Sequence, residues 1–346
     1  MPGPKDYAYI VPKLRMARAQ LLTPDKVRDM TATIQFKEVV GYLRDTLFEK
    51  VADADNPDQA YRMLYTVYYS FLEGVARASP DEAKAIVDAF RRDDELRDIL
   101  AIAQAVQEGL QPSIVEMPTY HVEDSIVRRL ARDQESLTSP LRLLEALEGT
   151  WAREPVEAAF QLQQETGQPW IITWYHLPYS LRLFSEAIAG VPSVWRGLLE
   201  QVICPLVEYR VASAVLQAKA AGLEARLLDR LLSGVRLCGL DVQAIRQAYE
   251  REPSVADLAV VLRDQFPSIR LEGKRLGEVL KTARRSSRVA VRRAASHVFS
   301  SYPFQPAVVA AGVMLVRDDV DNVKSVVFSL KMKLKPDEYA HTIVVE

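Results

Sequence analysis

Apolar residues recur along the chain at helical spacing, and one stretch of thirteen residues carries this pattern three times. The copies run over residues 98–110, 211–223 and 322–334, so they start 113 and then 111 residues apart. Apolar side chains fall at i, i+3, i+4, i+7 and i+11, along one face of a predicted helix. The stripe consists of Ile99, Ile102, Ala103, Val106 and Leu110 in the first copy, Ala212, Val215, Leu216 and Leu223 in the second, and Val323, Val326, Val327, Leu330 and Leu334 in the third.

Residues that favour helix ends frame these copies. Three residues ahead of each copy stands an acid, Glu95, Glu208 or Asp319. Carboxylates are favoured by the positive end of the helix dipole, so we expect these acids to lie early in their helices. Gly109 and Gly222 occupy the place where a left-handed C-terminal cap is needed. The pattern therefore predicts three equivalent helices.

A second pattern repeats in the same order, ahead of the copies. It reads Leu-Arg-Asp-Thr-Leu-Phe at 43–48, Leu-Glu-Gly-Thr-Trp at 147–151 and Leu-Arg-Asp-Gln-Phe at 262–266. Two patterns, each found three times in the same order and the longer one repeating at about 112 residues, indicate three related units of ordinary domain size. We place these units at 1–112, 113–224 and 225–346. Patterns typical of strands are nearly absent, so the sequence predicts an all-α protein.

Composition and charge narrow the class of protein. Of 346 residues, 49% are hydrophobic and 26% are charged, as in ordinary globular proteins, and the formal net charge is −2. This charge gives no general attraction to nucleic acid. The longest apolar run, residues 307–316, is far shorter than the roughly 20 residues that cross a bilayer. Any membrane association is therefore expected to be peripheral or through a partner.

The two cysteines, Cys204 and Cys238, are 34 residues apart. This spacing matches no metal-binding motif and no disulfide framework. We therefore expect a reducing, cytoplasmic location.

Catalytic motifs are missing from the sequence. It contains no GxGxxG, GxxxxGK[ST], GxSxG or HExxH pattern. His121-Val-Glu123 matches half of a zinc deaminase motif, but the CxxC that should follow is absent. We predict no catalytic residue, cofactor or metal site.

A group of arginines is the strongest charge feature of the sequence. Five of them lie within ten residues of one predicted helix, with no acid between them. A solvated helix face is the favoured interpretation, and a docking surface for an acidic partner is the alternative. The group consists of Arg284, Arg285, Arg288, Arg292 and Arg293.

Three segments resemble a known family. Residues 303–324 combine Pro-Phe, an apolar run, Asp319 and Asn322, and a following lysine. Residues 7–22 and 94–110 are similar to the opening helix and an internal copy of the same family. The family is that of the C subunits of A-type ATP synthases, which are related to the d subunits of vacuolar ATPases. The chain departs from the family pattern at Gln305, Gly312 and Val211.

The resemblance implies a fold and a function. The fold would be three similar helical bundles around a pseudo-threefold axis, forming a funnel. The protein would be a non-catalytic central-stalk rotor subunit of a proton- or sodium-translocating A/V-type ATP synthase. It would rest on the membrane ring of proteolipid subunits at the cytoplasmic face, as a peripheral protein. Its mouth would hold stalk subunits D and F and transmit torque.

Two other classes of function compete with this interpretation. A helical scaffold or adaptor that binds an unrelated protein is the main alternative, although solenoid repeats usually span only 20–50 residues. An enzyme could assemble its site from scattered residues, with residues 170–176 as a wall. Nucleic-acid binding ranks last because the net charge is nearly zero.

Overall fold

The computed structural model describes residues 4–233 and 237–345, and within them it contains helices and no strand. The predicted all-α class is confirmed. The α-helices are α1 (Pro4–Tyr7), α2 (Ile10–Ala19), α3 (Pro24–Ala32), α4 (Phe36–Gly41), α5 (Pro57–Ala78), α6 (Asp81–Gln107), α7 (Ile126–Arg132), α8 (Pro140–Ala146), α9 (Arg153–Thr166), α10 (Ile171–Trp174), α11 (His176–Ala189), α12 (Ser193–Ala220), α13 (Ala225–Leu231), α14 (Val242–Arg251), α15 (Val255–Val261), α16 (Leu276–Ser300), α17 (Pro306–Lys331) and α18 (Pro336–Tyr339). Short 3₁₀ turns cover Glu49–Asp53, Ile114–Glu116, Pro118–His121, Gln134–Leu137, Leu262–Gln265 and Ala340–Thr342.

The three repeated stretches lie in the three longest helices. These are α6, α12 and α17, with 27, 28 and 26 residues. Each helix begins at a proline, which is Pro80 or Pro192 at the N-cap, or Pro306 at the first helical position. Each helix also ends three residues before its copy does. The three copies therefore occupy the same register in three helices of nearly equal length.

All three helices end in the same backbone motif. Gly109 and Gly222 have φ values of +70° and +67°, as a left-handed cap requires, and Lys333 takes the same place in α17 with φ +55°. The next residue donates its N–H to the carbonyl five positions back, at 2.8, 3.0 and 2.9 Å. The sequence did not predict the cap at Lys333, since lysine rarely adopts this conformation.

The predicted apolar stripe stops where these caps begin. Its members inside the helices are buried, except that Leu330 is half-buried. Leu110 and Leu334 are 57% and 37% exposed, and Leu223 is half-buried. Placing Leu110 and Leu334 on the buried face was wrong, because both residues lie beyond the last helical turn.

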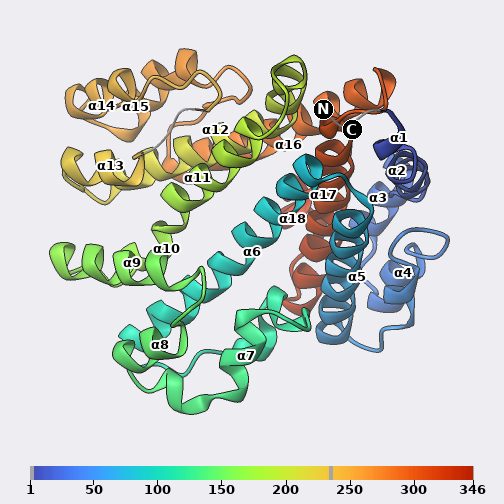
Figure 1. The fold of residues 1–346 in the computed structure, drawn as a ribbon, viewed down its shortest axis with the longest axis horizontal. Coiled ribbons are helices and arrows are strands. Elements are labelled where there is room, and N and C mark those ends of the chain that lie inside the picture. The colour runs from blue at the N-terminus through green and yellow to red at the C-terminus, as the bar shows by residue number, and fades with distance from the viewer. Residues whose placement is uncertain (1–3, 234–236, 346) are drawn as a thin grey trace.

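Six helices pack in a closed cycle. Each of the three longest helices follows a partner after a short link, which gives the pairs α5–α6, α11–α12 and α16–α17. Between pairs, α6 contacts α11, α12 contacts α16, and α17 contacts α5. Figure 1 shows α17 beside α5, and α16 alongside α12. The last pair in the sequence therefore packs against the first.

The second repeated pattern forms a turn that begins at a buried leucine in each of its three occurrences. Leu43, Leu147 and Leu262 are fully buried. Asp45 and Gly149 both have positive φ, at +59° and +71°. The third occurrence instead forms the 3₁₀ turn Leu262–Gln265. The pseudo-threefold axis and the boundaries at 112 and 224 remain predictions.

Candidate functional site

The repeated acids bind backbone amides of segments far away in the sequence. Glu95 accepts a hydrogen bond from the N–H of Ile126 at 2.5 Å, and Asp319 accepts one from the N–H of Leu22 at 2.7 Å. In both cases the amide belongs to a segment that leads into a short helix, α7 or α3. Asp319 reaches back across 297 residues, so its bond joins the end of the chain to its beginning.

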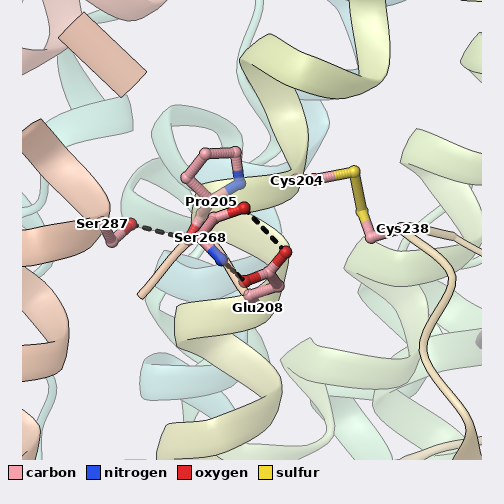
Figure 2. The surroundings of a disulfide bond; sticks show 6 residues. All are labelled: Cys204, Pro205, Glu208, Cys238, Ser268 and Ser287. Carbon is pink, nitrogen blue, oxygen red and sulfur yellow. Dashed lines mark hydrogen bonds between the residues drawn. A yellow bond between two sulfur atoms is a disulfide. The ribbon is translucent and has the colours of Figure 1, made fainter. Parts of the chain in front are cut away.

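Glu208 plays the corresponding part in α12. Its carboxylate accepts hydrogen bonds from the N–H and hydroxyl of Ser268, at 2.7 and 2.8 Å, as Figure 2 shows. The same view shows Ser287 of α16 donating to the Pro205 carbonyl of α12, at 2.7 Å. The helix-dipole explanation for the three acids was wrong. They lie near the middle of α6, α12 and α17, where they hold other segments in place.

A second polar position repeats three residues further along. Asp98 accepts hydrogen bonds from the N–H and hydroxyl of Thr119, at 2.8 and 2.6 Å. Asn322 exchanges two hydrogen bonds with the backbone of Val344, at 2.9 and 3.0 Å. Val211 takes this place in α12 without a polar group. Two of the three long helices thus use this position to fix the segment that follows them.

Burial raises the pKa of these carboxyl groups. The pKa of Asp98 rises to about 6, although the hydrogen bonds from Thr119 oppose the shift. The pKa of Asp319 also rises to about 6, in spite of the nearby Arg292 guanidinium. Burial raises the pKa of Glu95 and Glu208 as well. The native state therefore binds protons at these acids more tightly than an unfolded chain does.

A buried charge cluster joins the three longest helices. Asp93 of α6 is fully buried and forms two hydrogen bonds with the guanidinium of Arg210 of α12, at 2.7 and 2.6 Å. His176 of α11 contacts the same carboxylate through Nε2 at 2.7 Å. Arg317 of α17 binds Asp94 at 2.7 Å and approaches Asp93 at 3.7 Å. These ion pairs therefore join α6 to α12 and α17, which are far apart in the sequence.

The electrostatics of this cluster centre on Asp93. Burial alone would raise its pKa, but Arg210 and His176 outweigh burial and hold the pKa well below its usual range. Burial lowers the pKa of His176. Arg97 and Arg210 each stand directly before their copy of the repeat, and both lie within 3.5 Å of Asp93. Equivalent positions of α6 and α12 thus meet at one carboxylate.

Two of the five arginines of α16 are internal, which contradicts both interpretations of the whole group. Arg288 is buried and pairs with Asp318, and it also donates to Asn322 Oδ1 at 2.7 Å and to the Thr342 carbonyl at 2.6 Å. Arg292 pairs with both Asp318 and Asp319. A signal for this pairing exists in the sequence, since Arg288 and Asp318 are each 15 residues from Pro303 in the link between the two helices.

The remaining three arginines have different exposures. Arg285 and Arg293 are exposed, and Arg284 is half-buried. Arg285 and Arg293 line a hollow of 810 Å³ between α16, α12 and residues 267–270. An adjoining hollow of 220 Å³ is lined by Arg284, Arg285 and Arg288. The docking alternative thus stays a prediction for Arg284, Arg285 and Arg293 of this group.

The cysteines form a disulfide, although their spacing indicated no disulfide framework. Cys204 of α12 and Cys238 are joined with an S–S distance of 2.19 Å and Cα atoms 5.4 Å apart (Figure 2). The bond ties the connection between α13 and α14 to α12. A separation of 34 residues carries no signal for a single pair, because the fold brings the two residues together. The inference from the cysteine spacing to a reducing location therefore loses its basis.

The other chemical candidates do not converge. His121 lies in a 3₁₀ turn, and no group of three or more His, Cys, Asp or Glu side chains in residues 4–233 and 237–345 could hold a metal ion. A hollow of 170 Å³ beside Trp174 and His176 also includes Arg210, and the last two bind Asp93. Within the same described ranges, no helix has the length and apolar character to span a bilayer.

These features define a class of protein. It is an all-α protein whose repeated long helices pack in a closed cycle and are joined by buried ion pairs. Comparison with protein families identifies the family within this class. Residues 10–341 match the model of the ATP synthase (C/AC39) subunit family, and the chain belongs to this family.

Curated proteins of similar sequence come from three Pyrococcus species, and each is named as the C subunit of an A-type ATP synthase. The chain is 22% identical to the Pyrococcus abyssi protein over 349 residues, covering 96% of this chain and 88% of that protein. It is 23% identical to the Pyrococcus horikoshii protein over 353 residues, covering 97% and 90%. The Pyrococcus furiosus protein is 19% identical over 339 residues, covering 96% and 88%.

Proposed function

We propose that this chain is a non-catalytic part of an A/V-type rotary ATP synthase that couples the central shaft to the membrane rotor ring and transmits torque. Its partners would be the ring of proteolipid subunits and the stalk subunits D and F. It would lie at the cytoplasmic face of the membrane as a peripheral part of the complex. The family match over residues 10–341 and the full-length similarity to the C subunits of A-type ATP synthases support this assignment.

The closed cycle of six helices is the structural observation that carries the proposal. A part that transmits torque must resist shear between its elements, and a cycle has no free end at which helices can slide apart. The buried ion pairs from Asp93 and Asp94 to Arg210 and Arg317 add directional links between α6, α12 and α17. Breaking such a pair leaves an uncompensated buried charge, so each link opposes relative movement.

The buried titratable groups favour a mechanical function over a catalytic one. His176 and Arg210 bind Asp93, and Arg288 and Arg292 bind acids of α17. A catalytic acid or base must be available to a substrate, whereas His176 and Arg210 are held in ion pairs with Asp93 although they border the 170 Å³ hollow. These groups therefore serve packing between helices.

Co-purification tests the proposal directly. The tagged full-length chain is isolated from native membranes in mild detergent, and the bound proteins are identified by mass. We expect ATP synthase head, stalk and ring subunits together. Recovery of unrelated proteins alone would favour a helical adaptor and overturn the assignment.

A truncation tests the need for all three predicted units. Removing residues 225–346 takes away α16 and α17, which contact α12 and α5. We expect this chain to lose the stalk subunits in a pull-down, whereas the full-length chain retains them. Retention of the stalk by the truncated chain would contradict a socket built from three units.

A further inference from the structure

We infer that the hollow along the outer side of α16 binds an acidic helix of a partner protein. The hollow has a volume of 810 Å³ and is bounded by α16, by Gln201 and Pro205 of α12, and by residues 267–270. It adjoins the 220 Å³ hollow that Tyr209 and Thr342 help to line, and both hollows share Lys281 and Arg285. Together they form one surface, called here the α16 groove.

The α16 groove is cationic along its length. Lys281 and Arg285 stand one helical turn apart, and Arg293 follows two turns later on the same side of the helix. Arg270 faces them from the neighbouring loop, and Arg284 lines the adjoining hollow. Among the described residues that line either hollow, none is acidic.

Three of these cationic side chains have no acidic partner within the described part of the protein. For Arg270, Lys281 and Arg285, no carboxylate of the described part of the chain lies within the 4.0 Å that defines an ion pair. Arg284 is different, because its positive charge helps to lower the pKa of Asp321. Like charges one turn apart on a helix repel each other. An acidic partner would relieve this repulsion.

The shape of the α16 groove fits a helix. Small side chains recur at every fourth position next to the cationic row, and all four line the larger hollow. They are Thr282, Ser286, Ala290 and Ala294. Arg270 of the loop donates its N–H to Ser286 Oγ at 2.8 Å, so the loop borders the row at this point. Beside the loop, the small residues let a second helix approach closely, while the neighbouring cations reach its acids. From Lys281 to Arg293 the groove extends about 18 Å at 1.5 Å per residue, which accommodates roughly three helical turns.

The concave shape favours a helix over a membrane surface. A bilayer is flat on this scale and would contact only the rim of a hollow. Arginine also binds a carboxylate through two parallel hydrogen bonds, which a helix with glutamate at every fourth position can offer in series. The inference rests on the proposed function in one respect, since the natural helix would belong to a neighbouring protein of the assembly.

Peptide binding to the full-length chain tests this inference. The probe is a fluorescent helical peptide of about fourteen residues, with glutamate at every fourth position and alanine elsewhere, and the reference peptide carries glutamine instead. We expect the glutamate peptide to bind at low salt and to weaken as salt rises. The Lys281→Glu/Arg285→Glu variant should lose at least about tenfold in affinity.

A matched variant controls for net charge. Arg128→Glu/Arg132→Glu makes the same charge change at the same spacing on α7 and should bind the peptide as the wild type does. Circular dichroism melting checks that both variants stay folded. Equal binding of the glutamine peptide, or unchanged binding to Lys281→Glu/Arg285→Glu, would overturn the inference. Phosphatidylglycerol vesicles test for a membrane as the occupant instead. If the wild type binds these vesicles and Lys281→Glu/Arg285→Glu does not, while neither protein binds the glutamate peptide, the inference is overturned.

The outcome is separable from that of the proposed function. If the wild-type chain co-purifies with ATP synthase subunits but does not bind the glutamate peptide, only the groove assignment fails. If the chain recovers no ATP synthase subunits, the proposed function fails whatever the peptide does.

Discussion

At the scale of single residues, Asp93 is the carboxylate at the centre of the buried charge cluster. It is fully buried and is bound by Arg210 and His176, while Arg97 and Arg317 lie within 3.7 Å. Such a carboxylate is tolerated inside a protein only because cations surround it. Asp93 would destabilise the fold if these partners were moved away. An aspartate at this position is therefore tolerated only when α11, α12 and α17 are correctly placed.

Replacing Asp93 by asparagine should therefore be costly. Asp93→Asn leaves Arg210 buried without its carboxylate, and removal of one partner from a buried pair typically costs about 3–5 kcal/mol. We expect a loss of this size in the free energy of unfolding, measured in urea at neutral pH. Asp88→Asn is the control, because Asp88 pairs with Arg91 at 3.9 Å near the surface and should cost less than about 1 kcal/mol. Similar losses in both variants would contradict the role of the cluster.

Asp98 predicts a dependence of stability on pH. Burial raises the pKa of Asp98, whereas the surrounding cations lower the pKa of Asp93. The pKa of Asp98 is about 6 in the folded protein and about 4 in an unfolded chain, so between these values the folded state binds more protons. The free energy of unfolding should thus fall as pH rises from about 4 to about 6, by up to about 3 kcal/mol from this residue. Asp98→Asn keeps an oxygen that can accept the Thr119 hydrogen bond but cannot ionise.

The measurement is a series of urea denaturation curves across this pH range. Asp98→Asn should flatten the decline relative to the wild type, and Glu157→Gln at an exposed site of α9 should leave it unchanged. An unaltered slope in Asp98→Asn would show that the carboxylate is equally solvated in both states.

At the scale of elements, the sequence predicted what is local and missed what depends on distant contacts. The stripe and the glycine caps follow from chain neighbours, so the long helices and the caps at Gly109 and Gly222 were predicted correctly. The hydrogen bonds from the N–H groups of Ile126 and Leu22 to Glu95 and Asp319 need tertiary structure. For the same reason, the burial of Arg288 and the cysteine pairing were missed.

The contact between α2 and α17 depends on the absence of a side chain at Gly312. A Cβ added at Gly312 would lie 2.7 Å from Leu14 Cδ2, and Leu14 is buried. Gly312→Val should therefore cost about 1–3 kcal/mol through overpacking. Gly74→Val serves as the control, because no atom lies within 4 Å of the Cβ position at Gly74 in α5.

A double-mutant cycle separates overpacking from a change in helix propensity. Leu14→Ala removes the side chain that blocks position 312, so the losses of Gly312→Val and Leu14→Ala should not add. We expect a coupling of about 1 kcal/mol or more in urea denaturation. Additive losses would mean that α2 and α17 adjust without contact between these two positions.

At the scale of the whole molecule, the cycle α5–α6–α11–α12–α16–α17 makes a prediction that a linear array does not. In a linear array each repeat contacts only its neighbours, so the terminal units open first. Here α17 packs on α5 and on α2, and Asp319 binds the N–H of Leu22. The first and last helix pairs are therefore neighbours and should open together.

Native-state hydrogen exchange at increasing urea measures this on the unmodified protein. Amides of α5 and α6 should exchange through the same opening reaction as those of α16 and α17, so their exchange free energies should converge at one urea concentration. The short helices α13 and α14 should open earlier, because they lie outside the cycle. If α5 and α6 instead opened at lower urea than α16 and α17, the chain would behave as a row of independent bundles. A row of that kind could bind a partner but would yield under torque at its weakest joint, so the same measurement also bears on the proposed mechanical function.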